Sequence, residues 1–203
     1  MRGRKSQRTG ADPLELVYVG RLAATKGIHE AIEALALLRR SGTPCRLTIA
    51  GSGPEEAALR AAAARHGVAA HVAFVGPVFE EAKTRLWLES DLFVFPTFHW
   101  EGLPYALLES MAAGTPPITT RVGGIPDVVH DRVHGLFVDP HSPAAVAEAV
   151  ALLANDRALL RRMGEAARER VHEHYRVDRL ADEFDRLYAD LTDQRAGRVA
   201  LHS

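Results

Sequence analysis

Two cations and two glycines follow the first apolar run of the sequence, and together they could bind a phosphate group. Gly20 and Arg21 come directly after the run Leu14–Val19, and Lys26 and Gly27 come just before a helical pattern. Glycine lets a backbone approach a ligand closely, and the amide groups at the start of a helix attract anions. Cations there oppose the helix dipole, so an anionic ligand explains them better than solvated surface side chains do. These residues favour a phosphate or diphosphate site.

A second glycine-containing loop, Gly51-Ser52-Gly53-Pro54, follows the next apolar run. It resembles the beginning of the Gly-x-Gly-x-x-Gly pattern of dinucleotide-binding proteins, but Glu56 occupies the third glycine position. The first loop likewise lacks the Gly-x-x-x-x-Gly-Lys-Ser/Thr order of a P-loop. The second loop fits a nucleotide lying close to the backbone at Gly51, and it fits a plain turn between a strand and a helix equally well.

Two carboxylates eight residues apart, Glu101 and Glu109, stand in the most informative stretch of the chain. Glu101 lies in an irregular segment, and Glu109 falls in the second turn of a helix predicted to begin at Pro104. Glu109 has apolar neighbours, so its charge needs a partner. A carboxylate can accept hydrogen bonds from two vicinal hydroxyls of a ribose or a sugar. For an isolated pair of glutamates the simpler alternative is favoured, in which Glu101 is an exposed loop charge and Glu109 pairs with an arginine.

The elements that must position these residues alternate between strands and helices. Strands are predicted at Leu14–Val19, Cys45–Ala50, His71–Val75, Leu92–Phe95, Pro117–Thr120 and Gly135–Val138, with helices between them and from Pro143 to about Leu191, broken near Asn155-Asp156 and around Tyr175–Val177. This alternation predicts right-handed βαβ units and an α/β fold with one doubly wound, Rossmann-like parallel sheet. Ligands of such sheets bind at the carboxyl ends of the strands, where the glycines, cations and carboxylates lie.

The composition of the 203-residue chain limits the classes of protein to which it can belong. The formal net charge of −1 gives no overall attraction to nucleic acid or to an anionic membrane, and Lys5, Lys26 and Lys83 are the only lysines. A lone cysteine, Cys45, excludes a disulfide framework and fits a reducing cytoplasm. No apolar stretch reaches the roughly 18 residues of a transmembrane segment, and Met1–Gly10 lacks the apolar core of a secretory signal.

Several further motifs occur in order along the chain. They are Tyr18-Val19-Gly20-Arg21-Leu22 with Lys26-Gly27, Ala50-Gly51-Ser52-Gly53-Pro54, Phe74-Val75-Gly76, Glu101-Gly102-Leu103-Pro104, Leu108-Glu109-Ser110-Met111-Ala112-Ala113-Gly114, Val122-Gly123-Gly124-Ile125-Pro126-Asp127-Val128-Val129 and His134-Gly135-Leu136-Phe137-Val138. In this order they closely resemble the C-terminal, donor-binding domain of retaining GT-B glycosyltransferases of the group 1 family (family 4). The pair Glu101 and Glu109 matches the E-x7-E motif of that family.

The resemblance implies a role for each candidate residue. Arg21 and Lys26 would act in catalysis, holding the diphosphate and stabilising the charge on the leaving nucleotide in place of a metal ion. Glu101, also catalytic, would position the donor sugar, and Glu109 would bind the ribose hydroxyls. Further donor-binding positions are Gly20, Gly51, Gly76, Pro77, Gly102, Leu103 and Pro104. No metal and no cofactor beyond the nucleotide-diphosphate sugar is implied.

Two features depart from the family pattern. Glu101-Gly102-Leu103-Pro104 stands where many members have Glu-Gly-Phe-Gly, and Pro104 has no N–H to donate to a ligand. The N-terminal domain that supplies the acceptor site in the family is not expected within this sequence. We therefore expect a disordered lead-in at residues 1–12, one nucleotide-sugar-binding domain at residues 13–192 and a flexible tail at residues 193–203, completed by a partner domain or subunit.

Three hypotheses about function remain. The first is the donor-binding half of a cytoplasmic enzyme that transfers a sugar with retention of anomeric configuration, and that meets a membrane only peripherally, through its partner domain. The second is a stand-alone sugar-nucleotide-binding or regulatory module without catalysis, which needs the same residues. The missing third glycine argues against the third, an NAD-dependent oxidoreductase. A predicted apolar stripe could dock a partner or belong to the core, at Leu180, Phe184, Leu187 and Tyr188.

Overall fold

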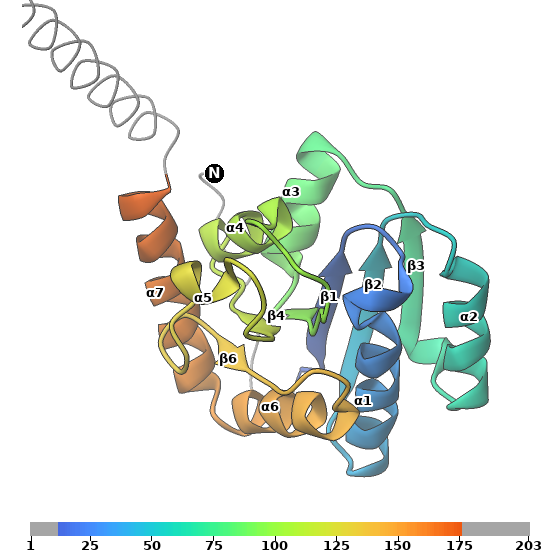
Figure 1. Ribbon diagram of the computed structural model, residues 1–203. Helices are drawn as coiled ribbons and strands as arrows, with labels where there is room; N and C mark the ends of the chain where they lie inside the picture. Colours follow the sequence, from blue (N-terminus) through green and yellow to red (C-terminus); the bar gives the residue numbers. More distant parts are fainter. Residues whose placement is uncertain (1–11, 176–203) are drawn as a thin grey trace, which may run out of the picture.

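Six parallel strands form the sheet in the computed structural model, which describes residues 12–175 (Figure 1). The strands are β1 (Leu14–Val19), β2 (Cys45–Ala50), β3 (Val72–Gly76), β4 (Leu92–Phe95), β5 (Pro117–Thr119) and β6 (Leu136–Phe137). Their order across the sheet is β3-β2-β1-β4-β5-β6. The chain builds outward from β1 to β3 and then returns to add β4 on the other side of β1. The predicted doubly wound α/β fold is confirmed.

Helices connect the strands and continue the chain after β6. They are α1 (Ile28–Arg40), α2 (Glu56–Arg65), α3 (Glu80–Glu89), α4 (Tyr105–Ala112), α5 (Ile125–Val128), α6 (Pro143–Asn155) and α7 (Arg157–His174). Helix α1 packs against α2 and α6, whereas α4 lies beside α3 and α7 (Figure 1). Asp156 separates α6 from α7, because its carboxylate accepts the Leu159 N–H at 2.8 Å and caps the second helix. The predicted break near Asn155-Asp156 is confirmed.

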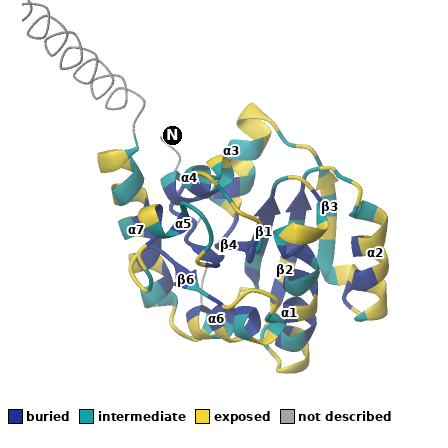
Figure 2. Cartoon of the chain, in the orientation of Figure 1, coloured by how far each residue is buried: buried dark blue, intermediate teal, exposed yellow. Residues whose placement is uncertain are grey.

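The core is centred on the inner strands of the sheet (Figure 2). Successive residues of β1 and β4 point to opposite faces, and all but one of them are buried, so both faces of the sheet are covered there. Strand β3, at the edge, alternates between partly buried and exposed residues. Cys45 is fully buried, and burial raises the pKa of its thiol to about 11. It acts as a small apolar core residue, as predicted.

Some predicted boundaries differ from the observed ones. Strand β3 begins and ends one residue later than predicted, β5 ends one residue earlier, and β6 is limited to two residues. Helix α4 begins at Tyr105, because Pro104 has an extended ψ of 118° and its carbonyl accepts the Leu107 N–H at 3.0 Å. Pro104 is therefore the N-cap residue and not the first helical residue. The predicted lead-in through residue 11, the tail and the stripe Leu180–Tyr188 lie outside the described residues.

The reversal of winding places the loops after β1 and β4 side by side at the carboxyl edge of the sheet. Leu16 and Val17 of β1 pair with Leu92 and Phe93 of β4. Parallel neighbours end at the same edge, so the loop that carries Arg21 and Lys26 lies next to the loop that carries Glu101. In doubly wound sheets this switch in strand order is where ligands bind.

The loops after β1, β2 and β3 pack backbone against backbone at this edge. Gly51 has a φ of +144°, and a Cβ there would lie 1.8 Å from the carbonyl oxygen of Gly20. The Gly51 N–H donates to the Gly76 carbonyl at 2.8 Å, and the Gly20 N–H donates to the Ala50 carbonyl at 3.0 Å. Gly51 is thus required by the contact between two loops, whatever ligand they bind.

We expect Gly51→Ala to lower the free energy of unfolding by about 3 kcal/mol or more, because the new methyl group must push two loops apart. The matched control is Gly67→Ala, where φ is +72° but nothing lies within 4 Å of the new Cβ. That control should cost only about 1 kcal/mol, from the left-handed backbone alone. Urea denaturation of both variants measures the difference, and equal losses would contradict the close approach.

A buried histidine lies in the turn before β6. His134 is 7% exposed, and its Nδ1 accepts the backbone N–H of His130 at 3.1 Å. Burial, together with the nearby His130, Arg170 and His174, lowers the pKa of His134 to about 4. Native His134 is therefore neutral down to about pH 4, whereas in the unfolded chain it takes up a proton near pH 6.5.

Stability should therefore fall as the pH is lowered from 7 through the interval between these two pKa values. At pH 5 the contribution from His134 is a loss of up to about 2 kcal/mol in the free energy of unfolding. His134→Asn keeps an acceptor for the His130 N–H and removes the titrating group. Urea titrations at pH 7 and pH 5 should show a smaller loss in this variant, and parallel losses in both proteins would rule out His134 as the source.

Candidate functional site

Three loops converge at the carboxyl edge of the sheet, following β1, β4 and β5. The Phe98 N–H donates to the Thr25 carbonyl at 3.1 Å, which joins the first loop to the second. The Gly124 N–H donates to the Glu101 carbonyl at 2.9 Å, which joins the second loop to the third. These backbone contacts fix the position of Glu101 between two neighbouring loops.

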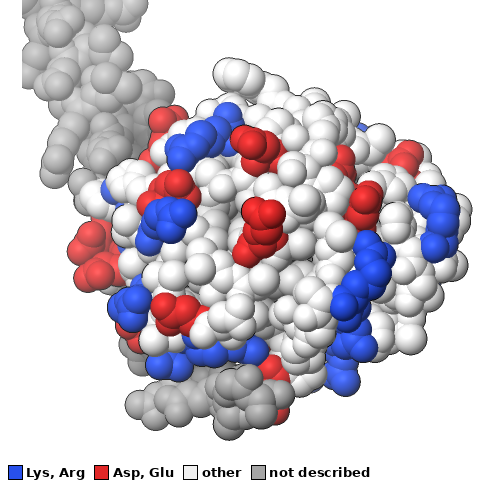
Figure 3. Space-filling model, turned by 90° about the horizontal axis from the view of Figure 1, so that it is seen from below, with Lys and Arg blue, Asp and Glu red and all other residues white. Residues whose placement is uncertain are grey.

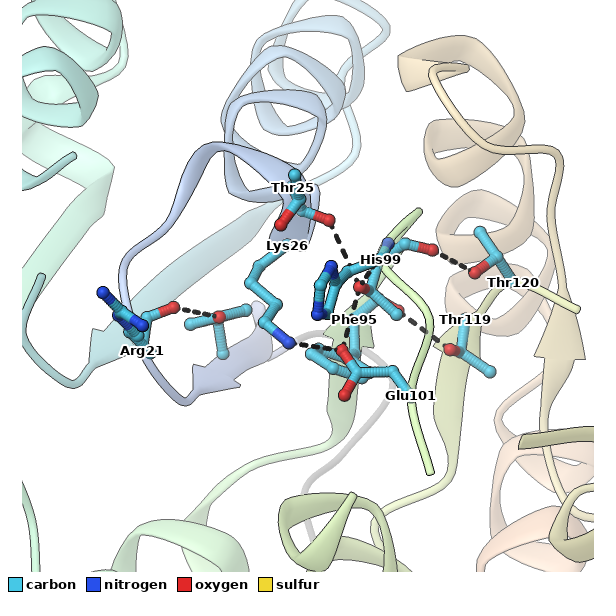
Figure 4. A network of polar contacts seen from close by, with 10 residues as sticks. Arg21, Thr25, Lys26, Phe95, His99, Glu101, Thr119 and Thr120 are labelled. Carbon is cyan, nitrogen blue, oxygen red and sulfur yellow. Dashed lines mark hydrogen bonds and ion pairs between the residues drawn. The ribbon is translucent and has the colours of Figure 1, made fainter. Parts of the chain in front are cut away.

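Lys26 and Glu101 form an ion pair in the middle of this group of loops (Figure 4). The Lys26 Nζ lies 2.5 Å from Glu101 Oε1, and the two side chains are only 17% and 12% exposed. A pair this sheltered is screened less by solvent than an exposed surface pair. The structure therefore brings together two of the three residues that the sequence predicted to act in catalysis.

Thr97 contacts the Glu101 carboxylate of the ion pair and was not assigned a role from the sequence. It is fully buried, and its hydroxyl lies 3.1 Å from Glu101 Oε1 and 3.2 Å from the Thr25 carbonyl. The same hydroxyl accepts the His99 N–H at 3.2 Å, and the Thr97 carbonyl accepts a hydrogen bond from Thr120 (Figure 4). The signal in the sequence was a single polar residue two positions after the wholly apolar strand β4.

Gly123 allows the third loop to approach Glu101. It has a φ of +54°, and a Cβ there would lie 1.8 Å from the Glu101 carbonyl oxygen. The glycines of the Gly123-Gly124 motif thus hold the backbone of Glu101, which leaves its side chain free to face Lys26.

Arg21 stands apart from the ion pair. The Tyr18 hydroxyl donates to the Arg21 carbonyl at 2.8 Å, while the guanidinium is exposed and lies away from Lys26 (Figure 4). Within residues 12–175 this guanidinium has no hydrogen bond or ion pair. Burial and the charge of Glu101 raise the pKa of Tyr18, so its phenol keeps the proton that it donates. Arg21 is therefore anchored by its backbone and presents an unengaged cation at the edge of the site.

Glu109 is held by α3. Its Oε1 lies 2.6 Å from the Lys83 Nζ, and its Oε2 accepts the indole N–H of Trp87 at 3.4 Å. The alternative considered for Glu109 was an arginine partner, but the observed partner is a lysine. The side chain of Glu109 remains 29% exposed, so ligand hydroxyls can still reach it.

The remaining predicted positions line the same edge or lie just beyond it. Gly20, Gly51 and Gly76 join the loops after β1, β2 and β3 through their backbones, as described above. Pro77 is exposed, Gly102 has open space around its Cα, and the Leu103 side chain is 42% exposed. Pro104 caps α4 and offers no N–H to a ligand.

The site combines cations with carboxylates that can accept hydrogen bonds. Lys26 and Arg21 are suited to an anionic group, and Glu101 and Glu109 to hydroxyl groups. No group of three or more His, Cys, Asp or Glu side chains is placed to hold a metal ion in the part of the chain that the structure describes. Among the same residues, no helix is long and apolar enough to cross a membrane.

Charges elsewhere are dispersed. On the face seen from below, acidic and basic side chains are interspersed with uncharged surface (Figure 3). Basic side chains adjoin one another in one row on the right of this view.

Comparison with known proteins connects this geometry to a family. The model of the family described as "Glycosyl transferases group 1" matches residues 2–170. The chain belongs to the group 1 glycosyl transferases. The fold matches the C-terminal domain of GT-B members. One of them is the C-terminal domain of a group 1 family protein from Francisella tularensis, which has a TM-score of 0.72 and 23% identity. The match covers 81% of this chain and 87% of that one.

Two curated relatives in this family come from Mycobacterium tuberculosis. A glycogen synthase is 39% identical over 164 residues, which cover 81% of this chain and 39% of the relative. A GDP-mannose-dependent alpha-(1-6)-phosphatidylinositol monomannoside mannosyltransferase is 38% identical over 184 residues, which cover 88% of this chain and 48% of the relative. This group 1 chain therefore spans less than half the length of the curated relatives that it matches.

The ion pair can be tested by a double-mutant cycle with Lys26→Met, Glu101→Gln and the combined variant. Each single change leaves a sheltered charge without its partner, so we expect a coupling of about 1–2 kcal/mol in the free energy of unfolding. The exposed pair Arg60–Glu56, one helical turn apart at 2.8 Å, is the control and should give under about 0.5 kcal/mol. Additive effects at Lys26 and Glu101 would show that the two side chains are not paired in solution.

Proposed function

We propose that this domain binds a nucleotide-diphosphate sugar and presents it for glycosyl transfer with retention of anomeric configuration. The observation that carries the proposal is the Lys26–Glu101 ion pair at the switch in strand order of a group 1 chain. The name of the mannosyltransferase relative includes GDP-mannose, which is a donor of this chemical class.

The diphosphate would lie at the N-terminus of α1, between Lys26 and Arg21. The N-cap of α1 is Gly27, which has no side chain to satisfy the first amide groups of the helix. Those amides and the two cations form a site for an anion. Binding would exchange the present partner of Lys26, Glu101, for phosphate oxygens.

The two glutamates would bind the sugars at either end of the donor. Glu101, once Lys26 turns to the phosphates, would accept hydrogen bonds from hydroxyls of the transferred sugar. Glu109 would accept from the ribose 2′- and 3′-hydroxyls through its carboxylate oxygens. The base would lie against the backbone near Gly76 and Pro77, which leaves its identity to experiment.

In the proposed reaction the bond between the anomeric carbon and the diphosphate oxygen breaks, and a bond forms from the same face to an acceptor hydroxyl oxygen. The hydroxyl proton leaves with the departing nucleoside diphosphate. Lys26 and Arg21 would stabilise the charge that builds on the diphosphate, so we expect no metal ion to be required.

The acceptor site would come from an N-terminal domain or subunit that closes over this edge of the sheet. This part of the proposal rests on the length of the relatives, of which the chain spans 39% and 48%. Any peripheral contact with a membrane would come through that second part.

Calorimetric titration of the purified chain with UDP, GDP and ADP tests the donor site. We expect one nucleotide to bind selectively, with EDTA leaving the affinity unchanged. Lys26→Ala and Glu109→Ala should each weaken binding by roughly tenfold or more, since each removes a charged hydrogen-bonding partner. Arg85→Ala, an exposed change on α3, is the control and should bind like the parent chain.

Failure of a folded chain to bind any of the three nucleotides would refute the proposed donor site in this chain. Binding of a nucleotide sugar without transfer, even after an N-terminal domain from a relative is added, would instead favour a regulatory module. The anomeric configuration of any product, read by NMR, tests retention.

A further inference from the structure

A pair of side chains on α3, outside the sequence motifs, contacts the carboxylate of Glu109. Lys83 and Trp87 are four residues apart and therefore lie on one face of α3. Lys83 contacts Oε1 of Glu109 at 2.6 Å, and the Trp87 indole donates to Oε2 at 3.4 Å. Both carboxylate oxygens are thus engaged from the same helix, each by a different donor.

The position of this helix is fixed by the core. Trp87 is fully buried, and its ring packs edge-on against Phe93 of β4 with ring centroids 5.2 Å apart. A buried indole needs an acceptor for its N–H, and Glu109 supplies it. Trp87 therefore sets where Oε2 lies, and Lys83, 31% exposed, sets the rotation of the carboxylate and balances its charge.

Lys83 and Trp87 occupy only half of the acceptor positions of the Glu109 carboxylate. An ionised carboxylate has about four acceptor positions, two on each oxygen. Lys83 and Trp87 take one position on each oxygen, which leaves one free position on each. Two free positions on one carboxylate match two vicinal hydroxyl groups.

We propose that Lys83 is a positioning residue that, together with Trp87, holds Glu109 ready to accept both ribose hydroxyls of the nucleotide. This inference rests on the proposed donor site. The simpler alternative is that Lys83–Glu109 is only an ion pair tying α3 to α4, which would affect stability but not the recognition of hydroxyl groups.

The test compares a nucleoside diphosphate with its 2′,3′-dideoxy analogue, using whichever of UDP, GDP and ADP binds the parent chain. Lys83→Met should weaken binding of the ribonucleotide by roughly fivefold to tenfold, because the carboxylate loses its orientation. The dideoxy analogue lacks the hydroxyl groups that Glu109 would accept. We therefore expect it to bind more weakly than the ribonucleotide, and with the same affinity to Lys83→Met as to the parent chain. Lys83→Arg should restore most of the discrimination.

Two controls separate the possible outcomes. Arg85→Met removes a charge from an exposed position of the same helix and should leave both affinities unchanged. Glu109→Gln combined with Lys83→Met should be no worse for the ribonucleotide than Glu109→Gln alone, if Lys83 acts through Glu109.

Equal losses for both nucleotides in Lys83→Met would overturn the inference, because they would indicate direct contact with phosphate or a general structural role. A gain in ribonucleotide affinity would also overturn it, since Lys83 would then compete with the ribose. If the parent chain bound no nucleotide, the proposed donor site itself would fail. Binding by the parent chain with no change in Lys83→Met would refute only the role of Lys83.

Discussion

Close backbone contact between loops is the constraint on which the candidate site depends. Neighbouring parallel strands lie only about 4.8 Å apart, so the loops that leave their carboxyl ends compete for the same space. Glycines allow these loops to pack closely. A Cβ at Gly51 would lie 1.8 Å from the Gly20 carbonyl oxygen, and a Cβ at Gly123 would lie 1.8 Å from the Glu101 carbonyl oxygen. Because the loops touch, Lys26 and Glu101 meet although 75 residues separate them in sequence.

The Lys26–Glu101 ion pair restricts which ligands could bind at this edge of the sheet. Lys26 and Glu101 are sheltered from water and already neutralise one another, which limits the cost of holding either charge at this edge. An anion that binds here must replace Glu101 as the partner of Lys26, and Glu101 must then find donors such as hydroxyl groups. A ligand that carries a phosphate beside a sugar satisfies both charges at once, whereas a simple anion satisfies only Lys26. The Arg21 guanidinium has no hydrogen bond or ion pair among residues 12–175 and is a second cation at this edge.

The sequence predicted the interior of the fold better than its margins. Strands β1, β2 and β4 have the predicted bounds, because most of their residues are buried and apolar. Strand β3 lies at an edge of the sheet, where exposed residues weaken that pattern, and its bounds shifted by one residue. Strands β5 and β6 are shorter than predicted, although their residues are buried or partly buried. The start of α4 shifted by one residue, because the fixed φ of proline fits both the first helical position and the cap.

In the site, the order of the strands determines where some residues lie, and the packing of side chains determines where others lie. Lys26 and Glu101 follow adjacent strands, so the strand order places their loops side by side. Thr97 and Lys83 were not assigned, because their roles depend on how side chains from different elements interlock. The contact of Lys83 with Glu109 depends on how α3 and α4 lie against each other, which the local sequence of neither helix specifies. The guanidinium of Arg21 points away from Lys26, a side-chain orientation that the order of the strands does not determine.

A row of buried aromatic side chains connects the two ends of the site through the core. Trp87 packs on Phe93, Phe93 stacks on Phe95 at 5.3 Å, and Phe95 contacts Tyr18 at 6.1 Å between ring centroids. Each end of the row carries a polar group that leaves the core: the Trp87 indole donates to Glu109, and the Tyr18 hydroxyl donates to the Arg21 carbonyl. Closely packed aromatic rings resist displacement, so the distance between these two anchors is set by the core and not by the loops. The core therefore fixes the Glu109 carboxylate and the Arg21 carbonyl relative to one another, whereas the Lys26 side chain and the Arg21 guanidinium are not held by this row of rings.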